Sequence, residues 1–263
     1  MKRTSVAGAW LVSVLMTGAV WGQVQGTIVN NDGKPLTGLL KWKVSAKAYT
    51  VTANNMDLEV PLASVSEIQI AKPKDLEAAE KQISGGNAEL AIPILEKITK
   101  EYFMLKWDKP AIRYLAEAHM AAGNTDKAIK TCEAIIAADP TAAYVGEIAP
   151  LYWQALLKAG KTAKAEELVL KAIKSGDRLA SAFALIMRGD LVLATGDTAD
   201  NAKKALRDGY LRVITLYKSE AEAQPEALSK AAKCFEKAGQ SGRADQLRSE
   251  LKKNFATSKW AQK

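Results

Sequence analysis

The sequence predicts a mainly α-helical fold, a right-handed solenoid of about five helical hairpins preceded by a small antiparallel β-barrel or sheet. Two patterns indicate this fold. Beyond Pro73, a glycine follows a helical segment at spacings of 37, 37, 36 and 43 residues; these glycines are Gly86, Gly123, Gly160, Gly196 and Gly239. A period of about 34 to 40 residues, with two helices and a short turn in each unit, is typical of helical solenoids. Before Pro73, apolar and polar residues alternate with period two, which predicts strands.

The chain begins with the features of a secretory signal peptide. Lys2 and Arg3 precede an apolar run from Val6 to Val20, and small residues follow it. The run is shorter than the roughly 20 residues of a permanent membrane anchor. We therefore expect residues 1–22 to be a signal peptide cleaved near Gly22 to Gln25, with an uncleaved anchor as the alternative. The remaining chain is then periplasmic or secreted, and soluble after cleavage.

The charge pattern argues against a nucleic-acid partner. Without Lys2 and Arg3, 35 basic residues stand beside 29 acidic ones, a net charge of +6. Lysine and glutamate often lie three or four residues apart, as on solvated helix faces. No basic run interleaved with aromatic residues occurs, so we expect no nucleic-acid binding and no membrane contact beyond an uncleaved signal segment.

Residues 24–72 are predicted to form the β module. A short strand at Thr27–Val29 precedes the tight-turn sequence at Asn30–Gly33. The apolar positions that alternate with polar ones share one face, and they are Leu40, Trp42, Val44, Tyr49, Val51, Leu58, Val60, Leu62, Ile68 and Ile70. Four or five short strands with one apolar face must close into a barrel or cover that face.

The helical array is predicted to span residues 74–255, after the boundary at Lys72–Lys74, and to end in a tail, residues 256–263. Two helices of a hairpin approach closely only where small residues lie between them. Residues seven before and five after each glycine are mostly small: Ala79 and Ala91, Ala116 and Ala128, Trp153 and Ala165, Gly189 and Ala202 (one residue late), and Ala232 and Ala244.

The second unit carries a family resemblance. Its signature-like residues fall where tetratricopeptide repeats place theirs: Leu115, Ala116, Gly123, Ala128, Asp139 and Pro140. Residues from about 75 to 255 thus resemble the tetratricopeptide repeat family, with departures at Ala202, in the spacing before Gly239, and at His119, where the family usually has tyrosine. The stretch from Leu251 to Ala261 is similar to the repeat ends of envelope proteins such as the Tol-Pal coordinator family, which favours the bacterial cell envelope.

The resemblance implies a concave groove, lined by the first helix of each unit, that binds a protein or peptide partner of the envelope. The residues it assigns to this groove are Arg113, Glu117, Met120, Gln154, Leu157, Lys158, Asp190, Leu193, Lys233 and Lys237. Phe183 and Ile186 fall on the same face, with core packing as their alternative role. An apolar middle between charged ends suits a peptide whose apolar anchor is flanked by charges.

Catalytic and cofactor chemistry is not expected. Gly160–Thr162 reads like the end of a phosphate-binding loop, but Ala155 stands where that loop needs a glycine, and the segment joins two helices. His119 is the only histidine, which removes most nucleophile–histidine and multi-histidine metal arrangements. We expect His119 to be a partly buried structural residue, and no enzyme activity, cofactor or metal.

Two cysteines, Cys132 and Cys234, lie three repeat units apart. Adjacent helices are about 8–10 Å apart, so these Cα atoms are expected to lie beyond the roughly 7 Å that a disulfide spans. The sequence therefore predicts two reduced, buried thiols.

The favoured function is a non-enzymatic, exported scaffold for protein interactions. One alternative is a carbohydrate or cell-wall polymer binder that uses Trp42, Trp107, Trp153 and the basic excess. Another is a structural subunit that associates with itself through the ends of the array. The oligomeric state stays open at this point.

Overall fold

The computed structural model describes residues 23–262 and divides them into two compact units. One contains residues 23–71 with 100–106, and the other contains residues 72–99 with 107–262. The expected signal peptide, residues 1–22, lies outside the described residues. None of the helices described between residues 23 and 262 has the length and apolar character needed to cross a bilayer.

The first unit is a five-stranded antiparallel sheet, as predicted. Its strands are β1 (Val24–Asn30), β2 (Pro35–Lys43), β3 (Ala48–Ala53), β4 (Met56–Pro61) and β5 (Val65–Gln69). Their order is β4-β3-β2-β1-β5, so β4 and β5 are the edges of an open sheet rather than neighbours in a closed barrel.

One face of the sheet is the apolar core of this unit. Its buried residues are Ile28, Leu40, Trp42, Tyr49, Val51, Val60 and Ile70. The rings of Trp42 and Tyr49 meet edge to face, with centroids 4.8 Å apart. Residues 100–106 belong to this unit too, because Leu105 is buried and the Tyr49 hydroxyl donates to the Met104 carbonyl at 3.0 Å.

Three residues predicted to face this core are exposed instead. Val44, Leu58 and Leu62 are 56%, 50% and 44% exposed. Val44 and Leu62 begin 3-10 turns, η1 (Val44–Ala46) and η2 (Leu62–Ser64). The alternation of side chains along a strand therefore no longer determines which way these two side chains point. Leu58 lies in the edge strand β4, which has a neighbour on one side only.

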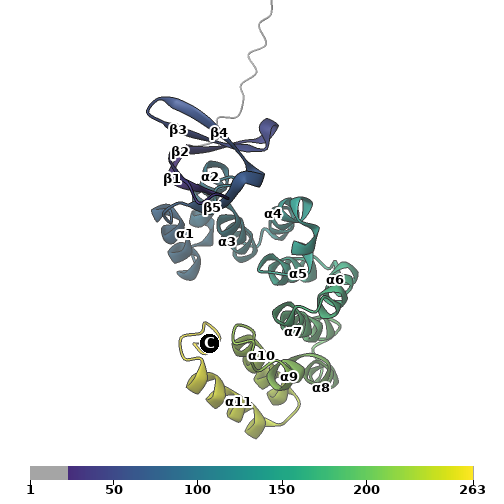
Figure 1. The fold of residues 1–263 in the computed structure, drawn as a ribbon. Helices are drawn as coiled ribbons and strands as arrows, with labels where there is room; N and C mark the ends of the chain where they lie inside the picture. Colours follow the sequence, from purple (N-terminus) through teal and green to yellow (C-terminus); the bar gives the residue numbers. More distant parts are fainter. Residues whose placement is uncertain (1–22, 263) are drawn as a thin grey trace, which may run out of the picture. The chain divides into compact units, whose positions relative to one another are not determined.

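The second unit is a solenoid of helical hairpins of the tetratricopeptide type, as predicted (Figure 1). Four hairpins consist of two uninterrupted helices: α1 (Lys74–Ser84) with α2 (Ala88–Glu101), α3 (Asp108–Ala121) with α4 (Thr125–Ala138), α5 (Ile148–Lys158) with α6 (Thr162–Lys174), and α10 (Gln224–Lys237) with α11 (Ser241–Asn254). In the fourth hairpin along the chain, α7 (Arg178–Ala194) is followed by α8 (Ala199–Ala205), a π-helical turn η4 (Leu206–Tyr210) and α9 (Leu211–Leu216).

The recurring glycines form the turns of these hairpins. Four of them are the middle residue of a three-residue connection and have φ between +70° and +82°: Gly86, Gly123, Gly160 and Gly239. Glycine adopts this left-handed conformation without the steric penalty of a Cβ atom, which is why it ends helices so often. The connection after α7 has one residue more, 195–198, and Thr198 caps α8. This extra residue explains why Ala202 comes one position late.

Close helix packing accounts for the small residues on both sides of these turns. The alanines at these positions, from Ala79 to Ala244, are at most 1% exposed. In the fourth hairpin, a Cβ atom on Gly189 would lie 2.6 Å from the Tyr210 ring, and one on Gly209 would lie 2.6 Å from the Leu185 carbonyl oxygen. Two glycines therefore let α7 and η4 touch backbone to backbone.

Helix α7 is shared by two apolar clusters. The first runs from α3 to α7 and includes Ala184 and Met187, and the second runs from α7 to α11 and includes Leu185 and Ile186. Side chains on two faces of α7 are therefore buried, whereas Arg178 and Arg188 of the same helix are exposed.

The two cysteines belong to different clusters of this core. Cys132 lies in the first cluster and Cys234 in the second, and both are buried and free. The prediction of two reduced, buried thiols is confirmed.

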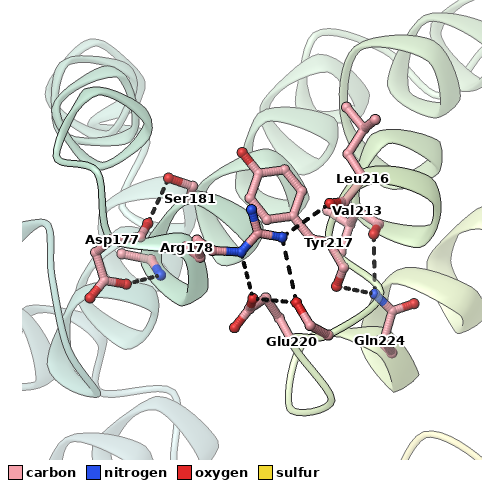
Figure 2. Close-up of polar contacts among 10 residues, drawn as sticks. Asp177, Arg178, Ser181, Val213, Leu216, Tyr217, Glu220 and Gln224 are labelled. Carbon is pink, nitrogen blue, oxygen red and sulfur yellow. Dashed lines mark hydrogen bonds and ion pairs between the residues drawn. The ribbon is translucent and has the colours of Figure 1, made fainter.

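Polar contacts tie the start of α7 to the connection between α9 and α10 (Figure 2). The Arg178 guanidinium donates to the Glu220 carboxylate at 3.0 Å and to the Leu216 carbonyl at 3.2 Å. The buried Gln224 amide donates to the carbonyls of Val213 and Tyr217, at 3.1 and 2.8 Å. These bonds satisfy carbonyls at the end of α9, and they hold the start of α7 and the start of α10 to that end.

Candidate functional site

A groove follows the first helices of successive hairpins in the helical unit. It consists of two adjoining pockets, a central pocket of about 610 Å³ and an end pocket of about 400 Å³. Gln154, Lys158, Glu226 and Lys259 line both pockets, so the two form one continuous surface. We call this surface the groove.

Most of the residues assigned to the groove from the sequence line one of these pockets. The central pocket contains Arg113, Glu117, Met120, Gln154, Lys158 and Phe183. The end pocket contains Leu157 and Asp190 besides the shared residues. Their contributing helices are α3, α5 and α7, each the first helix of its hairpin.

Four residues on the predicted face lie elsewhere. Ile186 is a core residue, and Leu193 packs partly buried against the second apolar cluster. Lys233 lines a separate pocket beside α11, and Lys237 forms an ion pair with Asp197.

The groove residues of α10 are Glu226 and Lys230 instead. They precede Lys233 and Lys237 by seven residues each, which is about two helical turns along the same face. The sequence thus predicted the face of α10 but not the position along it at which the groove ends.

One end of the groove is formed by Arg113 between two carboxylates. Its Nη1 donates to Glu117 Oε1 at 2.9 Å, and its Nε lies 3.3 Å from Glu147 Oε2. The guanidinium also lies 3.9 Å from the centre of the Tyr114 ring. These contacts hold the Arg113 side chain in one orientation while it stays 24% exposed to the groove.

The other end contains a charged cluster of Asp190, Tyr210, Glu226 and Lys230. Lys230 Nζ lies 2.5 Å from Asp190 Oδ2 and 2.6 Å from Glu226 Oε1, and the Tyr210 hydroxyl donates to Asp190 Oδ1 at 2.7 Å. The Lys230–Glu226 contact is an ion pair between residues one helical turn apart in α10. With two carboxylates and one ammonium, the charged cluster has a net charge of −1.

Burial and charge act in opposite directions on the pKa of Lys230. Burial lowers this pKa, but the carboxylates of Asp190 and Glu226 outweigh burial and raise it above its ordinary value. Burial, and then the Asp190 carboxylate, raise the pKa of the Tyr210 hydroxyl. Lys230 is therefore ammonium and Tyr210 is neutral at physiological pH.

Between these ends the groove has apolar walls. Met120, Leu151 and Phe183 line the central pocket, and each is buried or half-buried. The groove thus offers apolar contacts between two sets of charges. With Lys158 and Glu222 included, its lining outside the C-terminal segment has five carboxylates and three cations.

The tryptophans do not support the carbohydrate-binding alternative. Trp153 is fully buried and donates its indole N–H to the Ala143 carbonyl at 2.9 Å. Trp42 is 7% exposed in the core of the sheet, and Trp107 is half-buried. Because a sugar ring stacks on an accessible aromatic face, two of the three proposed residues cannot serve, and that expectation is wrong for them.

Other candidate chemical groups have structural roles. His119 is 3% exposed, and burial, with the charge of Lys127, lowers its pKa, so it is a neutral core residue. Gly160–Thr162 connects α5 to α6, not a strand to a helix. Among residues 23–262, no group of histidine, cysteine, aspartate and glutamate side chains could hold a metal ion.

Comparison with known proteins agrees with the repeat type. A family model described as tetratricopeptide repeat matches residues 82–149, which include α2, α3 and α4. Repeats of this type are typical of protein-interaction scaffolds. A search of curated proteins finds no significant match.

Solved structures with helical repeats are similar over much of the chain. Two are crystal structures of nearly identical TPR-like repeats from Podosopora anserina, one of them a point variant. The variant has 16% identity and a TM-score of 0.43, covering 70% of this chain and 94% of that one. The other has 16% identity and a TM-score of 0.42, covering 70% and 95%. The MamA protein has 18% identity and a TM-score of 0.40, covering 70% and 93%. All three TM-scores are below 0.5, so the repeat assignment depends on the glycine turns, the buried alanines and the family model.

Proposed function

We propose that this chain is an exported, non-catalytic scaffold that binds a segment of a protein partner of the cell envelope along the groove. The observation that carries the proposal is the combination of apolar walls with a charged set at each end, on side chains from α3, α5, α7 and α10. Peptides bind such grooves through an apolar anchor, and the surrounding charges select the sequence.

Charge complementarity indicates the partner segment. Apart from Lys259 of the C-terminal segment, the two pockets are lined by five carboxylates and three cations, including Lys158, which lines both. Positive charges on both sides of an apolar anchor complement this pattern, and like charges would be repelled. The partner is therefore a protein segment whose apolar anchor has basic neighbours.

Export rests on the N-terminal sequence, with its two basic residues and its short apolar run. Export and cleavage are tested by N-terminal sequencing of the chain recovered from the periplasm of expressing bacteria. We expect a new N-terminus between Gly22 and Gln25, whereas an intact Met1 in a membrane fraction would favour the anchor.

The binding proposal is tested by affinity capture from envelope extract with two matched triple variants. The groove variant carries Glu117→Ala, Glu147→Ala and Gln154→Ala, all residues of the central pocket. The control variant carries Glu89→Ala, Gln246→Ala and Glu250→Ala, which are exposed residues of α2 and α11 outside both pockets. Both triples remove two negative charges and one amide.

We expect one protein to be held by the original chain and by the control variant, and to be lost from the groove variant. Truncation of several central contact residues typically weakens binding by about 2–3 kcal/mol, or roughly 30- to 150-fold in Kd. Titration of the captured protein measures this change, and thermal unfolding shows whether the variants fold equally well. Equal binding to all three chains would refute the groove as the binding surface.

A further inference from the structure

The chain's own C-terminal segment, residues 255–262, lies at the end of the groove. It turns back after α11, with hydrogen bonds from the Ser258 amide to the Phe255 carbonyl and from the Ala261 amide to the Ser258 carbonyl, both 2.9 Å. These turns bring Lys259 and Trp260 to the charged cluster. Lys259 lines both pockets of the groove, and Trp260 lines the end pocket.

The contact between Trp260 and the charged cluster has the chemistry of a bound ligand. The centre of the indole ring lies 5.7 Å from Lys230 Nζ and 5.8 Å from Lys259 Nζ. An aromatic face near an ammonium group is attracted to it, most strongly where water is excluded. Lys259 also adds a positive charge beside a cluster whose net charge is −1, which is the complementarity deduced for the partner.

We propose that residues 255–262 are an internal ligand of the groove, competing with the protein partner for the end pocket. This inference rests on the proposed function, and it identifies the binding motif of the partner. The partner segment carries an aromatic residue next to a basic one, as Lys259 and Trp260 do. Its binding requires the tail to leave the charged cluster.

The tail is held in a way that permits this exchange. Trp260 is only half-buried, and Lys259 is exposed. The two tail hydrogen bonds described above join residues within the segment, so neither of these two bonds ties it to the groove. If the tail covers the end pocket in nine-tenths of the molecules, the apparent affinity for a competing segment falls about tenfold.

The probe for this inference is a fluorescein-labelled synthetic peptide with the sequence of residues 252–262. Its binding is measured by fluorescence anisotropy against the full chain and against full chains carrying Trp260→Ala or Lys259→Glu. Trp260→Ala removes the ring that lines the end pocket beside Lys230, and Lys259→Glu repels the tail from the charged cluster while keeping the ring. We expect the peptide to bind both variants about tenfold more tightly than it binds the original chain.

Two controls place the peptide in the groove. The same peptide with alanine in place of tryptophan is expected to lose binding at least tenfold. Within the Trp260→Ala chain, Glu226→Gln is expected to weaken binding of the original peptide severalfold, whereas Glu250→Gln, on the exposed side of α11, leaves it unchanged.

Equal affinity of the peptide for the original and variant chains would overturn the proposal, as would no binding to any of them. In the second case, a lower melting temperature of the Trp260→Ala chain would identify the tail as a structural cap on the last hairpin. Neither result changes the outcome expected for the groove variant in the affinity-capture experiment. If that variant still loses the captured protein, the proposed function stands while the internal ligand fails.

Discussion

Gly209→Ala is expected to destabilise the helical unit, although alanine is a better helix former than glycine. Gly209 lies in η4, against α7. An added Cβ atom would be 2.6 Å from the Leu185 carbonyl oxygen and 2.9 Å from the Gly189 amide nitrogen, whereas ordinary contact begins at 3.4 Å. The two backbones must therefore separate by about 0.8 Å, since neither obstructing atom belongs to a side chain that could rotate away.

The magnitude follows from two opposing effects. Overpacking of a close contact costs about 1–3 kcal/mol, and obstruction by backbone atoms favours the upper end of this range. Replacing glycine by alanine within a helix contributes about 1 kcal/mol in the opposite direction. The net loss is about 1–2 kcal/mol, which lowers the melting temperature by roughly 3–6 °C for a unit of this size.

Thermal and urea unfolding followed by circular dichroism at 222 nm measure this loss. Gly242→Ala is the matched control, because Gly242 lies in the first turn of α11 and a Cβ atom there meets nothing within 4 Å. We expect this control to be unchanged or more stable by up to about 1 kcal/mol. If Gly209→Ala melts at or above the temperature of the original chain, α7 and η4 do not make the close contact described above.

Two further predictions concern buried groups. Tyr210→Phe keeps the ring on Gly189 but removes the donor to Asp190, so we expect the urea unfolding free energy to fall by about 1–2 kcal/mol. An unchanged value would contradict this role of the hydroxyl. Burial raises the pKa of Cys132 to about 12, from 9.0. Above pH 9 the thiol loses its proton in the unfolded chain but keeps it in the folded chain. The free energy of unfolding therefore falls as pH rises, by about 2 kcal/mol between pH 9 and 11. Cys132→Ala is expected to show a shallower decline, and an equally steep one would refute the assignment. In the folded chain at pH 8, we expect a thiol reagent to leave both cysteines unmodified.

The hairpins were predictable because their signal is local. A left-handed glycine must follow the first helix, and small residues must lie where two helices approach, so both leave a repeating pattern in the sequence. The fourth hairpin departs from the period because a four-residue connection and a π-helical turn lengthen it. The exposure of Val44 and Leu62 was not predictable from alternation, since each strand ends in a 3-10 turn that the apolar pattern does not mark.

The groove was predictable only where its residues repeat from unit to unit. The positions in α3 and α5 follow the repeat, whereas the place on α10 at which the groove ends depends on how the fourth hairpin is closed. Arg178 and Gln224 close this hairpin by donating hydrogen bonds to backbone carbonyls at the end of α9 and just after it. Every residue has a backbone carbonyl, so the sequence does not indicate which ones accept these bonds. Lys259 and Trp260 were missed for a similar reason, because their positions result from the turns after α11 rather than from a periodic pattern.

The sharing of α7 between the two apolar clusters has a consequence for how the array melts. A solenoid can in principle lose its terminal repeats one at a time, because each hairpin contacts only its neighbours. Here one helix contributes Met187 to the first cluster and Leu185 to the second, so neither cluster can lose α7 without exposing the other. Unfolding of either half thus removes apolar contacts from its neighbour, which favours a single cooperative transition over stepwise fraying.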